Sequence, residues 1–413
     1  MVARVFETTY AGLRVLDLSE NIAGPLACLV LADMGADVLK VERPGTGEAT
    51  RALPPRWDGE STVFLTMNRN KRSVALDLRS DEGREACLAL AARADVVVES
   101  FRPGAAERLG LGFADMAAGN PRLVHCAVSA FGTGPLGRDR PGYDALLQAF
   151  SGIMEMTGEP DGGPARAAPS IIDITTGMWG VMAVMAALKR RDEACEPTPE
   201  ALEATLVDSA MFLQCHQVMG YLATGTFPGR LGSAAPSASP YQVFSTSTRP
   251  IMIATSTDSL YVRLCQALGL ATLADDPRFT TMQGRLDLRD ELTDVLQDRL
   301  SSASSEHWLD VLGQAGVPAG PVQDLGAAVR HPLTVERGLV APAEDGRIPG
   351  LQQVHLPMDR HRSAPRRPAP AVGEHTEAAL REAGLDEQQI SRASGRTSGD
   401  ADHERRRGTV PSA

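Results

Sequence analysis

Asp173 is the residue of this chain whose type and setting point most directly to covalent chemistry. It stands between a loop rich in Gly and Pro and a long apolar segment with helical spacing, so we expect it at the start of a helix. An aspartate there is usually an N-cap, whose side chain accepts a backbone N–H. The helix dipole and the free N–H groups would also hold its carboxylate ionised, as a carboxylate nucleophile requires. The two roles are compatible.

Other motifs with chemical meaning are weak or missing. Residues 132–137 spell G-x-G-x-x-G after a predicted strand, the pattern of a dinucleotide-binding loop. Pro135 and Pro141 bracket its third glycine and no helical pattern follows until Ala145, so we predict a surface turn instead. The six cysteines show no C-x-x-C spacing, and no G-x-S-x-G elbow occurs. The sequence therefore predicts no metal site, no disulfide framework and no serine-hydrolase site.

Composition narrows the class of protein further. The formal net charge is -11 and the basic residues are scattered, which argues against a nucleic-acid partner. Residues 1–10 do not resemble a signal peptide, and the longest apolar run, 177–188, is shorter than the roughly 20 residues of a membrane span. We therefore expect a cytoplasmic protein without a membrane partner.

The elements that must position Asp173 follow from the alternation of buried strands and helices. Helical patterns such as 26–34 and 81–92 separate these strands, which indicates an α/β fold with a mostly parallel sheet. The predicted strands are 13–18, 36–41, 73–78, 94–98 and 123–128.

A second, smaller module is expected later in the chain. Helices are predicted at 178–190 and 201–222, and a Pro- and Ser-rich passage then leads into short alternating strands and further helices, typical of a small α+β domain. The last residues are rich in Ser, Gly, Asp and Arg, which is typical of disorder. The expected domains are 1–222 (large), 223–328 (small α+β), 329–392 (return to the large domain) and 393–413 (disordered tail).

Six short motifs occur in one order along the chain. They are A-G-P at 23–25, G-A-D-V-L-K-V-E-R-P at 35–44, N-K-R-S at 70–73, F-R-P-G at 101–104 with R-L-G at 108–110, G-Y-D at 142–144, and G-E-H-T at 373–376. Together they resemble the family III CoA-transferases, the family of formyl-CoA transferase, carnitine CoA-transferases and α-methylacyl-CoA racemase. The resemblance covers about residues 11 to 390. It implies a Rossmann-like large domain, a smaller α+β domain and an interlocked homodimer.

The resemblance also implies a reaction. Asp173 occupies the place of the family's nucleophilic aspartate, which attacks an acyl-CoA thioester to give an aspartyl–acyl anhydride. CoA thiolate then re-attacks to give an aspartyl-CoA thioester, and CoA passes to an acceptor carboxylic acid. Coenzyme A is thus expected as part of a co-substrate.

Binding residues are implied in the same way. The phosphates of CoA need cations, and the matched positions carry Arg43, Arg79, Arg102 and Arg108. Phe101 could equally be a core residue, and Asp144 and Asp208 could equally make structural hydrogen bonds. The remaining residues implied to lie along the CoA and acyl channel are Ile22, Ala23, Leu76, Ser100, Phe101, Tyr143 and Asp144.

Departures from the family pattern bear on the substrate. Formyl-CoA transferase has glutamine where Ile22 stands, and Ser233 and Ala235 replace an amide and an imidazole found in many relatives. These changes favour an acceptor that is larger and less polar than oxalate. A racemase remains an alternative, although Tyr143 stands where racemases use histidine, and a tyrosine of pKa about 10 is a poor base. A non-catalytic acyl-CoA-binding subunit of a heteromeric complex is a third possibility, against which the presence of Asp173 argues.

Overall fold

The computed structural model describes residues 5–343, 346–358 and 366–394. Its contacts divide the chain into two compact units, which are described separately below. Unit 1 comprises Met1–Ser151, Ala168–Cys215 and Arg337–Ala413, and unit 2 comprises Gly152–Ala167 and His216–Glu336. The division differs from the predicted domains chiefly at Gly152–Ala167, which the sequence analysis placed inside the large domain.

Unit 1 is built on a six-stranded sheet in which every neighbouring pair is parallel. The strand order is β5-β2-β1-β6-β7-β8, the order of the Rossmann fold. The α/β fold expected from the sequence is therefore confirmed. The strands are β1 (Arg14–Leu18), β2 (Asp37–Glu42), β5 (Lys71–Ala75), β6 (Val96–Glu99), β7 (Val124–Ser129) and β8 (Glu200–Thr205).

Five of these strands lie within two or three residues of their predicted positions, but the prediction missed β8. One helix was predicted over 201–222, whereas the chain forms β8, then α10 (Leu206–Leu213) and α11 (Cys215–Thr224). The β8 sequence E-A-L-E-A-T is rich in residues that favour helices. It forms a strand because β7 offers a free edge, with which β8 pairs from Val124↔Glu200 to Ser129↔Thr205.

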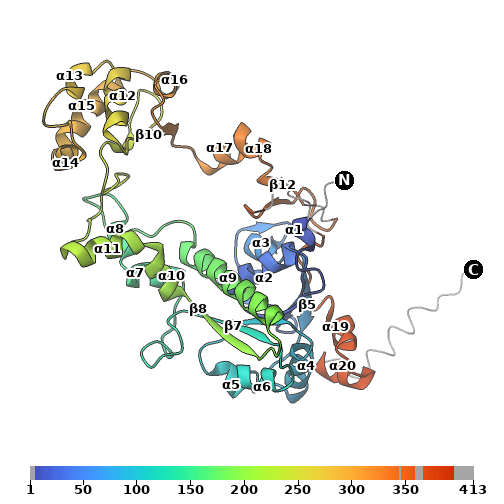
Figure 1. Cartoon of the computed structure of the whole chain (residues 1–413). Coiled ribbons are helices and arrows are strands. Elements are labelled where there is room, and N and C mark those ends of the chain that lie inside the picture. The colour runs from blue at the N-terminus through green and yellow to red at the C-terminus, as the bar shows by residue number, and fades with distance from the viewer. Residues whose placement is uncertain (1–4, 344–345, 359–365, 395–413) are drawn as a thin grey trace, which may run out of the picture. The chain divides into compact units, whose positions relative to one another are not determined.

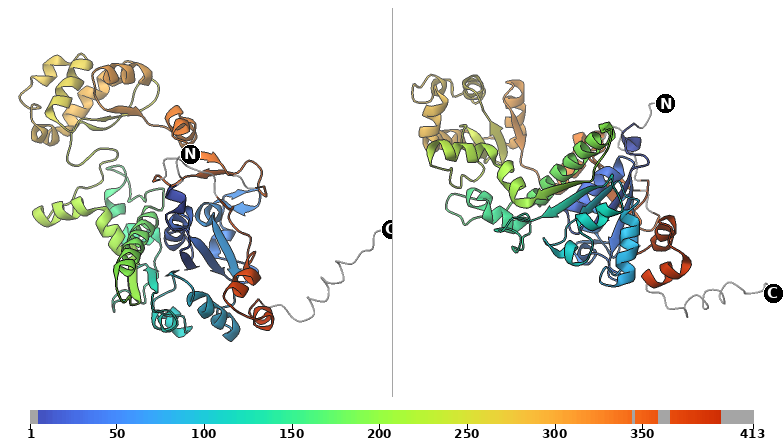
Figure 2. Two further views of the ribbon diagram at one scale, coloured as in Figure 1. Left: turned by 45° about the vertical axis from the view of Figure 1, so that its right-hand side comes forward. Right: turned by 60° about the horizontal axis from the view of Figure 1, so that its bottom comes forward.

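Helices cover both faces of this sheet (Figures 1 and 2). On one face α2 (Ala23–Asp33) packs against α9 (Ile171–Glu193), and the two contact β1, β2, β7 and β8. The other face is covered by α4 (Asp81–Ala91), α6 (Phe113–Ala118), α19 (Thr376–Glu382) and α20 (Glu387–Ala393), which share one hydrophobic core.

Shorter elements complete unit 1. The segment predicted to return to the large domain supplies α19, α20 and the hairpin of β12 (Val340–Pro342) and β13 (Gln352–Val354). Of the predicted disordered tail, residues 395–413 lie outside the described residues. The other short elements are α1 (Val5–Thr8), η1 (Ala49–Ala52), β3 (Arg56–Trp57), β4 (Glu60–Ser61), α3 (Thr62–Asn68), α5 (Ala105–Arg108) and α7 (Asp144–Phe150).

The helix α9 is long and apolar enough to cross a membrane by length and composition alone. It extends beyond the apolar run 177–188 on which the sequence analysis relied. A core helix of a soluble protein passes the same test, and α9 packs along α2 and over β7 and β8. This packing accounts for the buried face of α9, whereas Met178, Trp179 and Met182 of the same helix are exposed.

Unit 2 contains a three-stranded antiparallel sheet of order β11-β10-β9, formed by β9 (Tyr241–Phe244), β10 (Ile251–Ala254) and β11 (Ala319–Pro321). Helices pack against it around a core that includes Tyr261 and Trp308. They are α12 (Asp258–Ala267), α13 (Ala271–Ala274), α14 (Met282–Asp287), α15 (Arg289–Ser301) and α16 (Ser305–Gln314), with α8 (Ile153–Met156), α17 (Leu325–Arg330) and α18 (Pro332–Glu336) elsewhere in the unit.

Candidate active site

A pocket of about 500 Å³ opens at the carboxyl ends of the parallel strands. The chain leaves β1 and β6, which are neighbours, toward opposite edges of the sheet, so this point is the topological switch where α/β folds bind ligands. The pocket walls come from the segments that follow β1, β2, β5, β6 and β7 and from the start of α9. All of its lining residues belong to unit 1.

Most of the residues implied by the family resemblance meet in this pocket. Ile22, Arg108 and Asp144 do not line it. Those that do are Ala23, Arg43, Leu76, Arg79, Ser100, Phe101, Arg102, Tyr143 and Asp173.

Asp173 lies in the first turn of α9, as its third residue, and not at the N-cap. The N-cap is Ser170, whose side chain makes no capping bond. Burial, and then the negative charge of Asp144, raise the pKa of the Asp173 carboxyl to about 7. The expectation that the helix N-terminus would hold this carboxylate readily ionised was wrong, because desolvation and a like charge outweigh the dipole.

Asp144 takes the capping role that the sequence analysis gave to Asp173. Its Oδ2 accepts the backbone N–H of Ile172 at 2.8 Å and that of Asp173 at 3.2 Å, and its Oδ1 accepts Nε2 of Gln148 at 2.6 Å. Asp144 is itself the first residue of α7 and is 5% exposed. One buried carboxylate therefore fixes the start of α9 and sets the charge beside Asp173.

Replacing Asp144 by asparagine is expected to shift the pH profile of kcat/KM toward lower pH. The amide oxygen can still accept the α9 N–H groups, but the charge that raises the pKa of Asp173 is gone. If Asp173 must be ionised to react, the rise of kcat/KM with pH, centred near 7 in the parent, should occur at lower pH in Asp144→Asn.

Glu99 provides the necessary control for this measurement. It is the last residue of β6, it accepts the N–H of Phe101 at 2.5 Å, and burial raises its pKa to about 7 as well. A parent profile alone therefore cannot assign the titration. A profile that stays in place in Asp144→Asn but shifts in Glu99→Gln would assign it to Glu99 and contradict the prediction.

Gly177 determines how closely α9 approaches the pocket. It lies one helical turn after Asp173, on the same face of α9. A Cβ atom at Gly177 would lie 2.6 Å from the backbone oxygen of Ala23 and 3.0 Å from Cβ of Leu26. Only glycine lets the start of α9 lie this close to the start of α2, and Ala23 and Asp173 both reach the pocket as a result.

Several arginines give the pocket a positive rim within an acidic protein. Among the residues that the structure describes, no carboxylate lies within ion-pairing distance of Arg79, Arg102 or Arg140, all of which line the pocket and are exposed. Arg43 differs, because its guanidinium pairs with Glu20 at 2.7 Å. Free guanidinium groups of this kind are suited to bind an anion.

Arg108 lies just outside the pocket, near Gly104. A Cβ atom at Gly104 would lie 3.1 Å from one Nη atom of Arg108 and 3.7 Å from one of Arg138, so the two guanidinium groups converge on this glycine. Arg138 and Arg140 were missed by the sequence analysis. Both lie in the loop around the G-x-G-x-x-G pattern, which forms no helix, as predicted. The sequence feature that could have identified these two arginines is their position in a loop that follows a predicted parallel strand.

Ser100 and Phe101 have structural partners as well as a place in the pocket. The hydroxyl of Ser100 accepts the N–H of Glu20 at 2.8 Å, which joins the segment after β1 to the segment after β6. Phe101 packs against the core under the sheet and also lines the pocket. Phe101 therefore contacts both the core and the pocket, and its place in a CoA channel stays a prediction.

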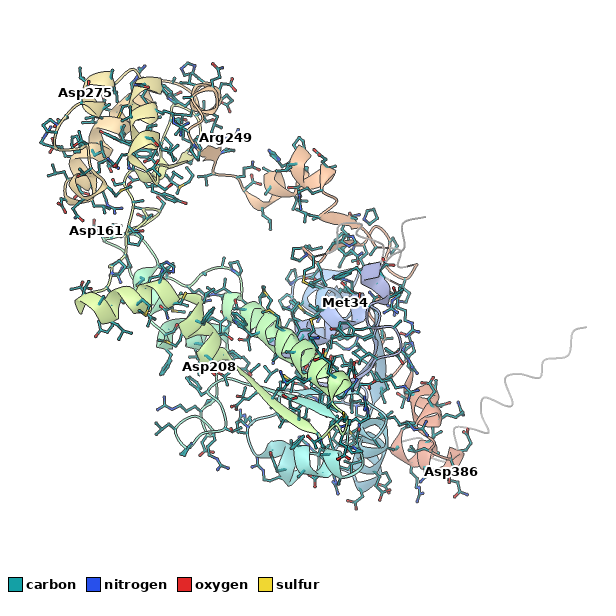
Figure 3. The ribbon with its side chains drawn as sticks, in the orientation of Figure 1. Met34, Asp161, Asp208, Arg249, Asp275 and Asp386 are labelled. Carbon is teal, nitrogen blue, oxygen red and sulfur yellow. The ribbon has the colours of Figure 1, made fainter. Side chains whose placement is uncertain are left out.

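Asp208 lies outside the pocket. It occupies the first turn of α10 (Figure 3), where its N–H donates to Oγ1 of Thr205 at 3.1 Å and its side chain is exposed.

Comparison with known proteins agrees with this geometry. The model of "CoA-transferase family III" matches residues 10–376. An acetyl-CoA:oxalate CoA-transferase of Acetobacter aceti is 36% identical over 343 residues, which are 83% of this chain and 87% of that protein. A succinate–glutarate CoA-transferase of Agrobacterium fabrum is 36% identical over 383 residues, 90% of this chain and 95% of that protein.

A solved structure is similar over nearly the whole fold. The crystal structure of a CAIB/BAIF family protein from Brucella suis has a TM-score of 0.80 and 34% sequence identity, and covers 91% of this chain and 100% of that one. The strand order, the pocket at the switch point and these matches lead to one conclusion: the chain belongs to CoA-transferase family III and is an enzyme of that family.

Proposed function

We propose that this enzyme moves CoA from an acyl-CoA donor to a carboxylic acid by covalent catalysis at Asp173. The observation that supports this most strongly is the position of the Asp173 carboxyl, partly buried in a pocket whose rim carries arginines that have no acidic partner in the described part of the chain. A carboxylate whose pKa is near 7 is a better nucleophile than one of ordinary pKa, and at neutral pH a large fraction of it is ionised.

The proposed steps conserve the activated acyl bond. Asp173 attacks the thioester carbonyl, the bond to sulfur breaks, and CoA leaves as thiolate while an aspartyl–acyl anhydride forms. The thiolate attacks the aspartyl carbonyl and releases the donor's carboxylic acid, which leaves an aspartyl-CoA thioester. The acceptor carboxylate attacks this thioester, and the returning thiolate then attacks the acceptor's acyl group and frees Asp173.

The nucleotide end of CoA is proposed to lie along the arginine rim. Arg79 and Arg102 line the pocket, and the pair Arg108 and Arg138 lies beside it at Gly104. The 3'-phosphate and diphosphate would accept charge-assisted hydrogen bonds from these groups. Leu76 and Phe101 would contact the adenosine and pantetheine parts.

Removing Arg102 is expected to weaken binding more than it slows turnover. A charge-assisted hydrogen bond contributes about 1.5 to 3 kcal/mol, so Arg102→Ala should raise KM for acyl-CoA by roughly ten-fold or more with little change in kcat. Arg43→Ala should have a smaller effect, because Arg43 already has Glu20 as a partner. Steady-state kinetics at two salt concentrations tests this, since phosphate pairing is screened by salt.

Arg249 serves as the matched control for these variants. It is an exposed arginine of unit 2 (Figure 3), paired with Glu306 at 3.2 Å, and Arg249→Ala should leave KM unchanged. Equal KM values in Arg102→Ala and the parent would show that the nucleotide binds elsewhere.

The acceptor is proposed to be a dicarboxylic acid larger than oxalate. Relatives are named for oxalate, glutarate and mesaconate, all of them dicarboxylic acids. In this chain Arg140 lines the pocket together with Tyr143, and it is available for a second carboxylate. Ile22 does not line the pocket, so the preference for an acid larger than oxalate rests on Ser233 and Ala235, which replace an amide and an imidazole found in many relatives.

One experiment tests the function directly. The protein is incubated in heavy water with a panel of acyl-CoAs and free mono- and dicarboxylic acids, and new thioesters are identified by mass. New CoA esters without deuterium at the α-carbon are expected. Deuterium uptake into an α-branched acyl-CoA without exchange of CoA would instead indicate a racemase, and no change in any thioester would indicate a binding subunit.

We further propose that the enzyme acts as an interlocked homodimer. Support comes from exposed apolar side chains of unit 1, among them Trp179 of α9 and Phe212 of α10, whose rings meet edge to face at 5.1 Å. Light scattering should give twice the mass of the chain, and a monomer with full activity would contradict this proposal.

A further inference from the structure

Two of the few lysines of this chain, Lys40 and Lys71, are buried beside the same carboxylate. Of the 41 basic residues only three are lysines, namely Lys40, Lys71 and Lys189. Lys40 and Lys71 are completely buried, and both approach the same carboxylate, that of Asp17, at 3.8 and 2.8 Å. Lys189 is exposed and pairs with Glu193. In a chain that otherwise uses arginine, the buried lysines point to sites that need a compact ammonium group.

The two ammonium groups hold the segment Ser19–Pro25, which we call the pocket segment, at its two ends. Lys40 Nζ donates to the backbone oxygen of Ser19 at 2.8 Å, and Lys71 Nζ donates to the backbone oxygen of Pro25 at 3.0 Å. Between these two points the chain supplies Glu20, Asn21, Ala23 and Gly24 to the pocket wall.

The pocket segment has a conformation that needs such support. Asn21 has φ of +71°, in the left-handed region that few residues other than glycine and asparagine adopt. At Gly24 a Cβ atom would lie 2.3 Å from Cβ of Ser19, so the segment folds tightly back on itself. Ser19 is further held by Asp17, whose Oδ1 accepts its backbone N–H at 3.0 Å and its hydroxyl at 2.5 Å.

Lys71 uses its whole donor capacity, whereas Lys40 makes one hydrogen bond and two ion pairs. Lys71 donates to Asp17, Pro25 and Asn68 at 2.8 to 3.0 Å. Lys40 donates to Ser19 and pairs with Glu48 at 2.9 Å, in addition to its longer contact with Asp17. An ammonium has three N–H groups in a tetrahedral arrangement, whereas a guanidinium is planar and larger. Arginine would keep the charge at these sites but could not reproduce the contacts.

We propose that Lys40 and Lys71 are positioning residues, which hold the pocket segment in the conformation that presents Ala23 and Gly24 to the reacting end of acyl-CoA. This inference rests on the proposed function, because it takes the pocket as the place of reaction. The lysines act through Ser19 and Pro25 and do not themselves line the pocket.

Lysine-to-arginine variants test this inference while keeping the charge. Lys40→Arg and Lys71→Arg should each lower kcat at least ten-fold, whereas KM for acyl-CoA changes less than three-fold, because the nucleotide end binds to other groups. Lys189→Arg should match the parent. Parent-like kcat in both Lys40→Arg and Lys71→Arg would overturn the inference.

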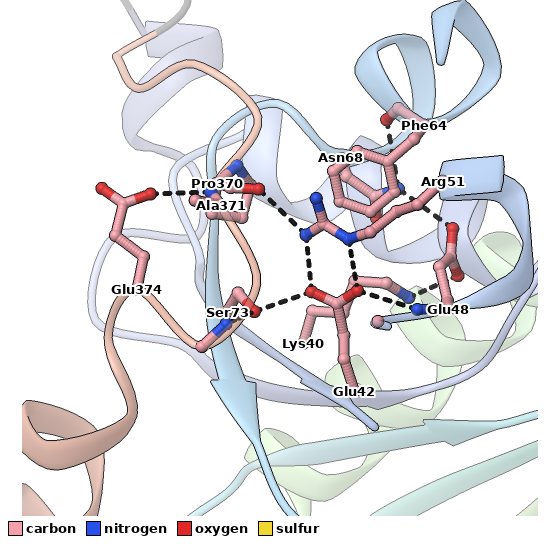
Figure 4. A network of polar contacts seen from close by, with 12 residues as sticks. Lys40, Glu42, Glu48, Arg51, Phe64, Asn68, Ser73, Pro370, Ala371 and Glu374 are labelled. Atoms are coloured by element: carbon pink, nitrogen blue, oxygen red, sulfur yellow. Dashed lines mark hydrogen bonds and ion pairs between the residues drawn. The ribbon is translucent and has the colours of Figure 1, made fainter. Parts of the chain in front are cut away.

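Arg51 provides a matched control inside the same buried network (Figure 4). It forms two hydrogen bonds of 2.7 Å with Glu42 and one of 2.9 Å with the backbone oxygen of Pro370, and it makes no contact with the pocket segment. Because Glu42 also lines the pocket, Arg51→Lys should lower the melting temperature and reduce kcat by less than three-fold, far less than either lysine variant. An equal loss of kcat in Arg51→Lys would show that the cluster acts through general stability, which also overturns the inference.

Hydrogen exchange on the parent gives an answer even if the lysine variants fail to fold. The N–H groups of Ser19 and Glu20 are bonded to the side chains of Asp17 and Ser100, and should exchange as slowly as those of β1 although Glu20 borders an open pocket. Exchange at the rate of an unprotected loop would overturn the inference. The exchange rates of these N–H groups do not depend on which reaction the enzyme catalyses. CoA transfer by Asp173→Asn would therefore refute the proposed function but not the role of the lysines.

Discussion

Asp173→Asn is expected to lower the rate of CoA transfer at least a thousand-fold. Loss of a nucleophile removes the covalent route altogether, and losses of this size or larger are typical of such substitutions. The fold should remain intact, because Asp144 bonds to the backbone N–H groups of α9 and needs no side chain at 173. Steady-state assays with a saturating acyl-CoA and acceptor acid measure the effect.

A trapping experiment locates the intermediate independently of the rate. Hydroxylamine added during turnover should leave a hydroxamate on Asp173 of the parent and on no residue of Asp173→Asn. The peptide carrying the adduct is identified by mass. An adduct on another carboxylate, or transfer at the parent rate in Asp173→Asn, would show that the nucleophile lies elsewhere.

The pH dependence of protein stability also reports the raised pKa of the Asp173 carboxyl. Its folded pKa of about 7 lies above the ordinary value of 3.8, so the folded state binds this proton more tightly than the unfolded state. Ionisation of Asp173 therefore lowers the free energy of unfolding progressively as the pH rises from 4, and the loss is complete above pH 7. Asp173→Asn should melt at a higher temperature than the parent at pH 8, and the difference should nearly vanish at pH 4.

Gly177→Ala is expected to lower kcat by ten- to a hundred-fold, although the substitution alters no group that takes part in the reaction. The added Cβ would lie 2.6 Å from the backbone oxygen of Ala23, so α9 or α2 must move by several tenths of an ångström or more. A displacement on the order of 1 Å between reacting groups can cost about a hundred-fold in rate. Asp173, one turn away on the same face of α9, moves with the helix.

Gly180→Ala is the matched control for this variant. Gly180 lies on the same helix and is also buried, but a Cβ there would meet its nearest atom, Cβ of Ala204, at 3.6 Å, an ordinary contact. Because alanine favours a helix over glycine by about 1 kcal/mol, Gly180→Ala should be at least as stable as the parent and equally active. Full activity in Gly177→Ala would show that the separation of α2 and α9 does not determine the rate.

The sequence predicted five of the six strands of the sheet because each of the five carries a clear local signal. Strands buried on both faces appear as short continuous apolar runs, such as 94–98, and each is followed by a helical pattern. The edge strand β8 has no such signal. Its residues favour a helix, and only the free edge of β7 makes Glu200–Thr205 a strand.

The sequence alone placed Asp173 at the start of a helix, because a Gly- and Pro-rich loop and an apolar segment meet there. It could not assign the helix cap, since the carboxylate that caps α9 is that of Asp144, 28 residues away from its first partner, Ile172. It also could not predict that the pKa of Asp173 rises, because desolvation and the charge of Asp144 exist only after α7 and α9 have packed.

The pocket itself was decided by tertiary structure. Local patterns identified the loops after the strands but not their neighbours, because strand order is set by pairing between distant segments. The parallel order brings the segments after β1 and β6 together, and with them Ser100 to the N–H of Glu20. The same order places Lys40 and Lys71, on neighbouring strands β2 and β5, beneath the pocket segment, where burial in a low dielectric makes their contacts with Asp17 strong and specific.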